Sequence, residues 1–111
     1  MKVTVKDTYT ILEDEYDDVI DFAAYLERVI PDKYKDLNLV IDLLKYDKLN
    51  LEQLSHFIKL SNSQREERRS FVFVNKDIDF DLIPDEAIVV PTLQEAIDII
   101  EMEEIERDLG F

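Results

Sequence analysis

The feature that most constrains this chain is a short, unbroken apolar run in its middle, Leu39 to Ile41, followed directly by Asp42. A strand with one solvent-exposed face alternates apolar and polar residues. A continuous apolar run therefore predicts a strand over about 38–43 that is covered on both faces. A loop over 45–49 should lead from this strand to a helix. A buried strand that feeds a helix is where many α/β folds place their working site.

The helix after this loop has a clear start signal. Asn50 and Gln53 have the spacing of a capping box, in which each side chain accepts a hydrogen bond from the other residue's backbone N–H. Helical periodicity predicts an inward face made of Leu51, Leu54, Phe57, Ile58 and Ser61.

The rest of the chain reads as further strands and helices around this centre. Asp17 or Asp18 can cap a helix that Pro31 should end, and Thr92 with Glu95 forms a second capping box. The expected elements are strands over 3–5 and 9–12, a helix over 19–30, the strand over 38–43, a helix from 50, a strand over 71–74, a loop or short helix over 77–84, a strand over 87–90 and a helix over about 92–109. The order predicts an α/β fold, a mixed sheet of about five strands with helices packed on it.

The last helix carries apolar residues on two nearly opposite faces. Leu93, Ala96, Ile97 and Ile100 form one face, whereas Met102, Ile105 and Leu109 form the other. Two alternatives follow. Either the helix ends near Ile100 and the tail folds back on its own domain, or the last turns offer an apolar stripe to a partner or a second copy.

Charge and composition exclude several function classes. The chain has 27 acidic against 13 basic residues, a net charge of −14, so it should repel a nucleic-acid backbone. The acids either keep a small domain soluble or attract a basic partner. With no Cys, there is no disulfide, thiolate zinc site or cysteine nucleophile. We expect a soluble, cytoplasmic protein without a membrane span.

The candidate chemical groups all have a plainer structural explanation. His56 is the one imidazole and should face solvent, so no Ser-His-acid set can be built. The acids in 77–81 start like a calcium loop but lack its Gly and its final Glu. The acids in 13–18 suit a helix N-terminus, although they could bind Mg²⁺ or a basic partner. The basic residues Arg65, Arg68 and Arg69 could contact an anion, but Glu66 and Glu67 between them favour pairing within the helix.

The order and spacing of these elements resemble the STAS domain, the fold of bacterial anti-sigma-factor antagonists. The resemblance is clearest over 39–102. The segment 41–54 follows the family's strand, loop and helix start, the segment 71–74 its next strand, and the segment 89–96 its closing strand and helix. The resemblance implies a single STAS-like domain over 1–111 that binds protein partners.

One part of the STAS pattern is missing. Switching members of that family carry an Asp-Ser pair at the start of this helix, and a partner kinase phosphorylates the Ser. Here those places hold Asn50 and Leu51, and leucine cannot accept phosphate. The nearest hydroxyl, on Ser55, lies a turn further along, so we expect the phosphoswitch to be absent.

The stretch 89–111 is also similar to short bacterial proteins that carry the label ribonuclease Z. That nuclease holds its metals with a His-x-His-x-Asp-His motif, and this chain has His56 alone. We therefore do not adopt the activity. The similarity still leaves an alternative function, that of a metal-dependent RNA-processing enzyme or accessory in which Asp77, Asp79 and Asp81 hold metal ions.

The sequence thus predicts a non-enzymatic regulatory or protein-binding module of STAS type with the phosphoacceptor missing. No catalytic, metal or cofactor-binding residue is predicted. A homodimer through the last helix is a further alternative. The residues expected to face a partner are Asp47, Lys48, Asn50, Met102, Ile105, Leu109 and Phe111.

Overall fold

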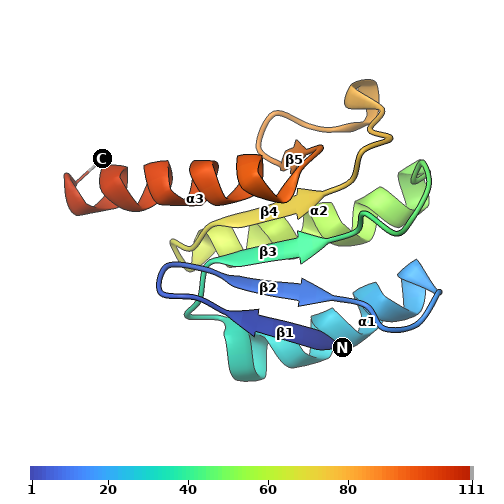
Figure 1. Ribbon diagram of the computed structural model, residues 1–111, viewed down its shortest axis with the longest axis horizontal. Coiled ribbons are helices and arrows are strands. Elements are labelled where there is room, and N and C mark those ends of the chain that lie inside the picture. The colour runs from blue at the N-terminus through green and yellow to red at the C-terminus, as the bar shows by residue number, and fades with distance from the viewer. Residues whose placement is uncertain (111) are drawn as a thin grey trace.

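The central apolar run forms the middle strand of the sheet. In the computed structural model, which describes residues 1–110, β3 (Leu39–Asp42) is third in a five-stranded sheet of order β1-β2-β3-β4-β5 (Figure 1). β1 pairs antiparallel with β2, and the remaining neighbours are parallel, so the sheet is mixed as predicted. The other strands are β1 (Lys2–Val5), β2 (Thr10–Glu13), β4 (Phe71–Val74) and β5 (Ile88–Val90).

Helices cover β3 and β4 on both faces of the sheet, which is why these two strands are apolar along most of their length. α1 (Val19–Val29) and α2 (Leu51–Glu66) lie behind the strands in Figure 1, and α3 (Leu93–Asp108) packs on the other face. The first core contains Leu12, Phe22, Leu26, Leu39, Ile41, Phe57, Phe71 and Phe73, and the second contains Val40, Val72, Val74, Val90, Ala96 and Ile100. No helix within residues 1–110 is long and apolar enough to cross a membrane.

Aromatic side chains join the layers of the larger core. The ring of Phe57 from α2 lies 6.4 Å from Phe22 of α1 and 6.1 Å from Phe73 of β4, measured between ring centroids. Both pairs are tilted rather than stacked face to face, the geometry that aromatic quadrupoles favour. Phe57 is fully buried, so it links both helices to the sheet.

The first α-helix ends just before Pro31, as predicted, with Val29 as its last residue and Ile30 as its C-cap. The chain continues past α1 as a π-helical turn, η1 (Ile30–Tyr34), with the proline in its first turn. A proline there needs no N–H donor, because the first N–H groups of a helical segment have no partner within it, and its fixed φ suits a helix. The α-helical hydrogen-bond pattern therefore ends before Pro31, and a π-helical turn that the sequence did not predict continues the chain.

α2 starts as the sequence indicates, with one exception. Asn50 Oδ1 accepts the N–H of Gln53 at 2.9 Å, and Gln53 Oε1 accepts the N–H of Asn50 at 2.9 Å. Leu54 and Phe57 point inward as predicted, but the prediction for Leu51 is wrong, since its side chain is 55% exposed. The first turn of α2 lies beyond the ends of the strands, where there is no sheet to cover it (Figure 1).

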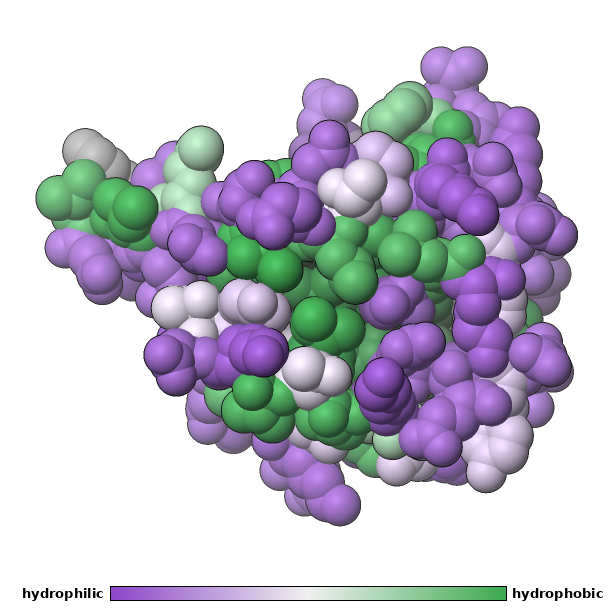
Figure 2. Space-filling view, viewed as in Figure 1, coloured by the Kyte–Doolittle hydropathy of each residue, from purple (hydrophilic) through white to green (hydrophobic). Residues whose placement is uncertain are grey.

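α3 settles the question of the two apolar faces. Thr92 Oγ1 accepts the N–H of Glu95 at 3.2 Å, and the helix then continues without interruption to Asp108. Gly110 follows it with a φ of 82°. The alternative in which the helix ends near Ile100 and folds back is therefore wrong. Figure 2 shows hydrophobic surface on the projecting end of the molecule, which belongs to α3 in Figure 1.

We predict that Phe57→Ala lowers the free energy of unfolding by about 3–5 kcal/mol, because it opens a cavity among two helices and the sheet. Leu51→Ala on the same helix is the matched control. It removes an exposed side chain and should change stability by less than about 0.5 kcal/mol. Urea unfolding followed by circular dichroism measures both. A similar loss in the two variants would contradict this account of the core.

Candidate functional site

The loop from Leu43 to Asn50 lies at the edge where the carboxyl ends of the parallel strands meet. Asn75, just after β4, holds one side of this loop. Its Nδ2 donates to the carbonyl oxygens of Leu43 at 3.0 Å and Tyr46 at 3.1 Å, and its Oδ1 accepts the N–H of Asp77 at 3.0 Å. Asn75 is 3% exposed, so these bonds are shielded from water. The loop therefore has a fixed path, although it has no regular secondary structure.

The segment after β2 holds the other side of the loop. The hydroxyl of Tyr46 donates to Asp14 Oδ2, and Lys45 Nζ donates to the backbone oxygens of Asp14 and Tyr16. Burial, and next the hydrogen bond to Asp14, raise the pKa of Tyr46 above its ordinary value. Lys45 Nζ also lies 3.3 Å from the carboxylate of Asp17. Both flanks of the loop are thus tied to neighbouring strand ends.

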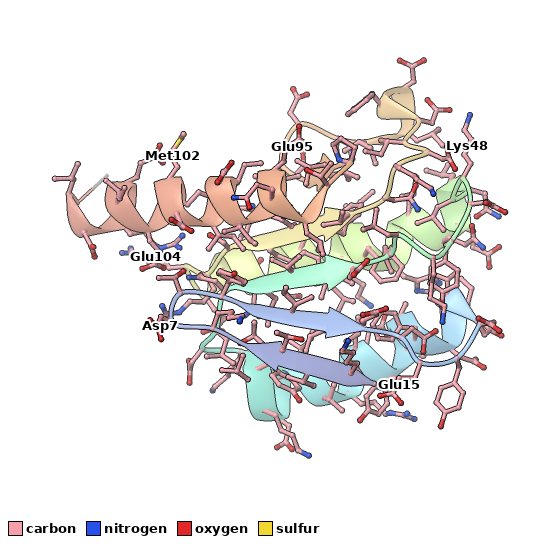
Figure 3. The ribbon with its side chains drawn as sticks, in the orientation of Figure 1. Asp7, Glu15, Lys48, Glu95, Met102 and Glu104 are labelled. Atoms are coloured by element: carbon pink, nitrogen blue, oxygen red, sulfur yellow. The ribbon has the colours of Figure 1, made fainter. Side chains whose placement is uncertain are left out.

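The residues that the sequence analysis selected in this loop are on its outside. Asp47, Lys48 and Asn50 are all exposed, and Figure 3 shows Lys48 reaching away from the body of the molecule. Lys48 Nζ lies 3.7 Å from Asp79, a solvent-exposed contact that contributes little to stability. The amide oxygen of Asn50 is occupied by the helix cap.

The interior beneath the loop is closely packed. The hollow between the loop, α2 and the segment 75–79 has a volume of about 10 Å³, roughly that of one water probe. Leu49 and Leu54 fill its floor. What this end of the molecule offers is an exposed contact surface beside a filled interior.

The acids over 13–18 are mostly used to hold the structure. Asp18, one of the two proposed caps, accepts the N–H groups of Ile20 and Asp21 at the start of α1, both at 3.1 Å. Asp14 is buried beneath Tyr46, and Glu15 lies 3.3 Å from the N-terminal ammonium. Capping and local pairing therefore account for this cluster.

A hollow of about 520 Å³ lies beside these acids, and sequence reasoning missed it. Carboxylates and tyrosine rings line much of it, which is a chemistry suited to a basic side chain. The sequence analysis named the acids over 13–18 as possible binders of a basic partner, but no motif indicated that the N-terminus and α1 would complete a hollow with them. Its lining residues are Met1, Asp14, Tyr16, Asp18, Asp21, Phe22, Ala24, Tyr25 and Arg28.

The remaining candidates are engaged in local structure. His56 Nδ1 lies 3.6 Å from Glu27 Oε1, with both side chains partly exposed between α1 and α2. Asp79 Oδ1 accepts the N–H of Asp81 at 3.1 Å and caps a short 3₁₀ helix, η2 (Phe80–Leu82), so the predicted loop or short helix is present. Within residues 1–110, no three His, Cys, Asp or Glu side chains come together as metal ligands would.

The prediction that the arginines after position 64 pair within their own helix is wrong. α2 ends at Glu66, and Arg68 adopts a left-handed φ of 60°, so the chain has already turned. Arg65 instead reaches α3, where its Nη1 lies 3.1 Å from Glu103 Oε2. The helix end removes the regular spacing that intrahelical pairs need.

The second group of predicted partner residues lies on the outer side of α3. Met102, Ile105 and Leu109 are between 60% and 66% exposed. Figure 3 shows Met102 on the side of α3 away from the strands, and it lies toward the opposite end of the molecule from Lys48. The structure therefore separates the predicted residues into two surfaces. Phe111 lies outside the described residues.

A polar network holds the inner side of this same helical segment. Asn38, just before β3, donates from Nδ2 to Glu104 Oε1 at 2.7 Å and to the Thr8 carbonyl at 2.9 Å. Arg107 Nη2 donates to Glu104 Oε1 at 2.6 Å and to Ser70 Oγ at 3.0 Å. The hydrogen bonds from Asn38 and then from Arg107 hold the pKa of Glu104 below its ordinary value.

Comparisons with known proteins agree with the fold. No family model and no curated protein matches the chain. Among solved structures it is similar to a serine-to-glutamate variant of RsbS from Moorella thermoacetica, with a TM-score of 0.66 and 19% identity over 96% of this chain and 97% of that chain. RsbS is a STAS-domain anti-sigma-factor antagonist. The STAS-like α/β fold is thus confirmed, whereas the similarity to proteins labelled ribonuclease Z stays a prediction.

We predict that Asn75→Ala destabilises the protein by about 1–3 kcal/mol and loosens the loop, because buried carbonyl oxygens lose their donor. Amide hydrogen exchange should speed up over 43–50 before it does in β3. Asn62→Ala, an exposed amide on α2, is the matched control and should change neither quantity. Unchanged exchange in the loop of the Asn75 variant would contradict its role as the anchor.

We predict that Glu104 contributes to stability in a pH-dependent way. Its pKa is lowered on folding, so the unfolded chain binds the proton more readily, and its stabilising effect is present above the ordinary value of 4.5. The effect should be lost as the pH falls through the lower, folded pKa. The difference in unfolding free energy between wild type and Glu104→Gln should therefore shrink in acid.

Urea unfolding at several pH values between about 3 and 7 measures this difference. Glu101→Gln removes an exposed carboxylate from the same helix and controls for the change in net charge. A difference that stays constant across this range would show that the hydrogen bonds to Glu104 do not favour its charged form.

Proposed function

We propose that this chain is a non-enzymatic regulatory module that binds a protein partner through the loop 45–50 and the start of α2. The observation that carries the proposal is the construction of this loop. Two neighbouring strand ends hold it in place, yet Asp47, Lys48 and Leu51 are exposed on it. A pre-ordered exposed surface loses little conformational entropy on binding, which favours recognition of another protein.

The filled interior beneath the loop supports binding over catalysis. An enzyme site needs a concave space in which reacting groups meet a substrate, whereas the hollow beneath the loop, lined by Leu49 and Leu54, has a volume of about 10 Å³. The STAS-like fold supports the same reading, since that fold serves protein-binding regulators. The proposed function is therefore recognition, without a chemical step at this site.

We also propose that this module works without phosphorylation at the helix start. Leu51 is the first residue of α2 and presents an apolar side chain where a switching STAS regulator would carry its serine. The hydroxyl of Ser55 donates to the Leu51 carbonyl at 2.7 Å, so it is already bonded within the helix. A partner would then meet a helix start whose charge is not changed by phosphorylation, and binding would be constitutive.

The charge of the chain supports a basic partner. A net charge of −14 attracts a basic surface over distance, and the hollow lined by Asp14, Asp21 and Tyr25 could accept its lysine or arginine side chains next to the loop. We place this interaction in the cytoplasm, a compartment in keeping with a chain that has no cysteine.

The test is capture of the partner from a native lysate with charge-swapped loop variants. The double variant Asp47→Lys, Lys48→Glu keeps the net charge and should lose a protein that wild type captures. The control Asp32→Lys, Lys33→Glu makes the same swap on η1, away from the loop, and should retain it. Equal capture by both double variants, or by neither, would show that the loop is not part of the binding surface.

A further inference from the structure

The projecting half of α3 carries a second surface that the loop does not use. Met102, Ile105 and Leu109 form a continuous stripe along about two helical turns, at 62%, 60% and 66% exposure. Three side chains of this size present apolar surface on the order of 300 Å², comparable with the largest patch on a typical monomer. Figure 2 shows hydrophobic surface at the projecting end of the molecule, which is the end of α3 in Figure 1.

The inner side of the helix explains why the stripe stays exposed. Glu103 accepts hydrogen bonds from Arg65 at 3.1 Å and from Ser70 Oγ at 2.6 Å, and Glu104 and Arg107 bond to Asn38. Turning the helix to bury the stripe would break all of these bonds at once. The polar network therefore fixes the rotation of α3 with its apolar side outward.

Acidic residues border the stripe on both sides. At 100° per residue, Glu106 lies on one flank, whereas Glu101 and Asp108 lie on the other, and all three are exposed. The one basic residue of α3, Arg107, is bonded toward the domain. The outer side of this helical segment is thus an apolar stripe with acidic residues on both flanks.

We propose that this stripe binds a basic amphipathic helix of a partner protein, laid along α3 with its apolar residues on Met102, Ile105 and Leu109. Lysine or arginine residues on the flanks of that helix would meet Glu101, Glu106 and Asp108. Anchors spaced at i, i+3 or i+4, and i+7 match the spacing of the stripe. This second surface goes beyond the proposed role of the loop and does not depend on it.

A second copy of this chain fits the stripe less well. Pairing of two stripes would bring the acidic flanks of both copies together, and like charges in an interface oppose association. The area buried by two patches would also stay below the roughly 1,200 Å² that stable interfaces need. A basic helix removes the charge conflict and adds ionic contacts along both flanks.

The probe for this surface is a dye-labelled peptide of about 15 residues that places leucines at the stripe spacing and lysines elsewhere. Fluorescence anisotropy compares it with a scrambled peptide of the same composition, which has the same charge but no apolar side. The striped peptide should bind the full chain about tenfold more tightly. Its binding should weaken as salt is raised from about 0.05 to 0.5 M.

Two pairs of matched variants locate the binding. Ile105→Ser should weaken peptide binding about tenfold, whereas Phe80→Ser, which changes an exposed aromatic residue on η2, should leave it unchanged. The double variant Glu101→Gln, Glu106→Gln should weaken binding and reduce its salt dependence. The control Glu52→Gln, Asp32→Asn removes the same charge elsewhere and should do neither. Circular dichroism confirms that each variant is folded.

Three results would overturn this proposal. One is equal binding of the striped and scrambled peptides, and another is binding that Ile105→Ser does not change. The third is a wild-type dimer in light scattering that strengthens with salt and dissociates in Ile105→Ser, which would assign the stripe to a second copy. The loop variant Asp47→Lys, Lys48→Glu should bind the peptide normally, so failure of the loop proposal and failure of this one can be told apart.

Discussion

Burial of β3 on both faces is the constraint from which the rest of this structure follows. Leu39 and Ile41 point into the core beneath α1 and α2, and Val40 points into the core beneath α3. A strand of this kind needs helices on two sides of the sheet and a neighbouring strand on each edge. Parallel pairing to β2 and β4 supplies the neighbours and brings their carboxyl ends to one edge, where the loop before α2 lies.

Two buried asparagines complete this apolar centre at its ends. Asn38 precedes β3 and Asn75 follows β4, and each satisfies backbone groups of segments that the sheet ladder does not reach. A buried polar group without a partner is costly, so each amide also determines where its neighbours can go. Asn75 positions the loop, and Asn38 joins the polar network that holds the end of α3.

These two anchored regions give the molecule two separate surfaces at opposite ends. The loop surface combines charge with an exposed helix start, whereas the surface on α3 combines an apolar stripe with acidic flanks. A single partner that engaged both proposed surfaces would gain joint affinity, because the second contact would form within the complex. The acidic charge of the whole chain would draw basic partners to either end.

Structural features that depend only on neighbouring residues could be predicted from the sequence alone. The apolar run at 39–41, the cap at Asn50 and the cap at Thr92 depend on neighbouring residues, and the strand and helix starts they predict are present. The absence of a hydroxyl at Leu51 is likewise a property of one position. Such features need no knowledge of the distant chain.

Only the tertiary structure decided which way the outer residues face. Leu51 is exposed because the sheet ends before the first turn of α2, and Arg65 pairs with Glu103, 38 residues away, instead of with its own helix. The stripe on α3 points outward because Asn38, Ser70 and Arg65 bind the opposite side of the helix. Periodicity placed the stripe on one side of a helix, but long-range hydrogen bonds determined that this side meets solvent.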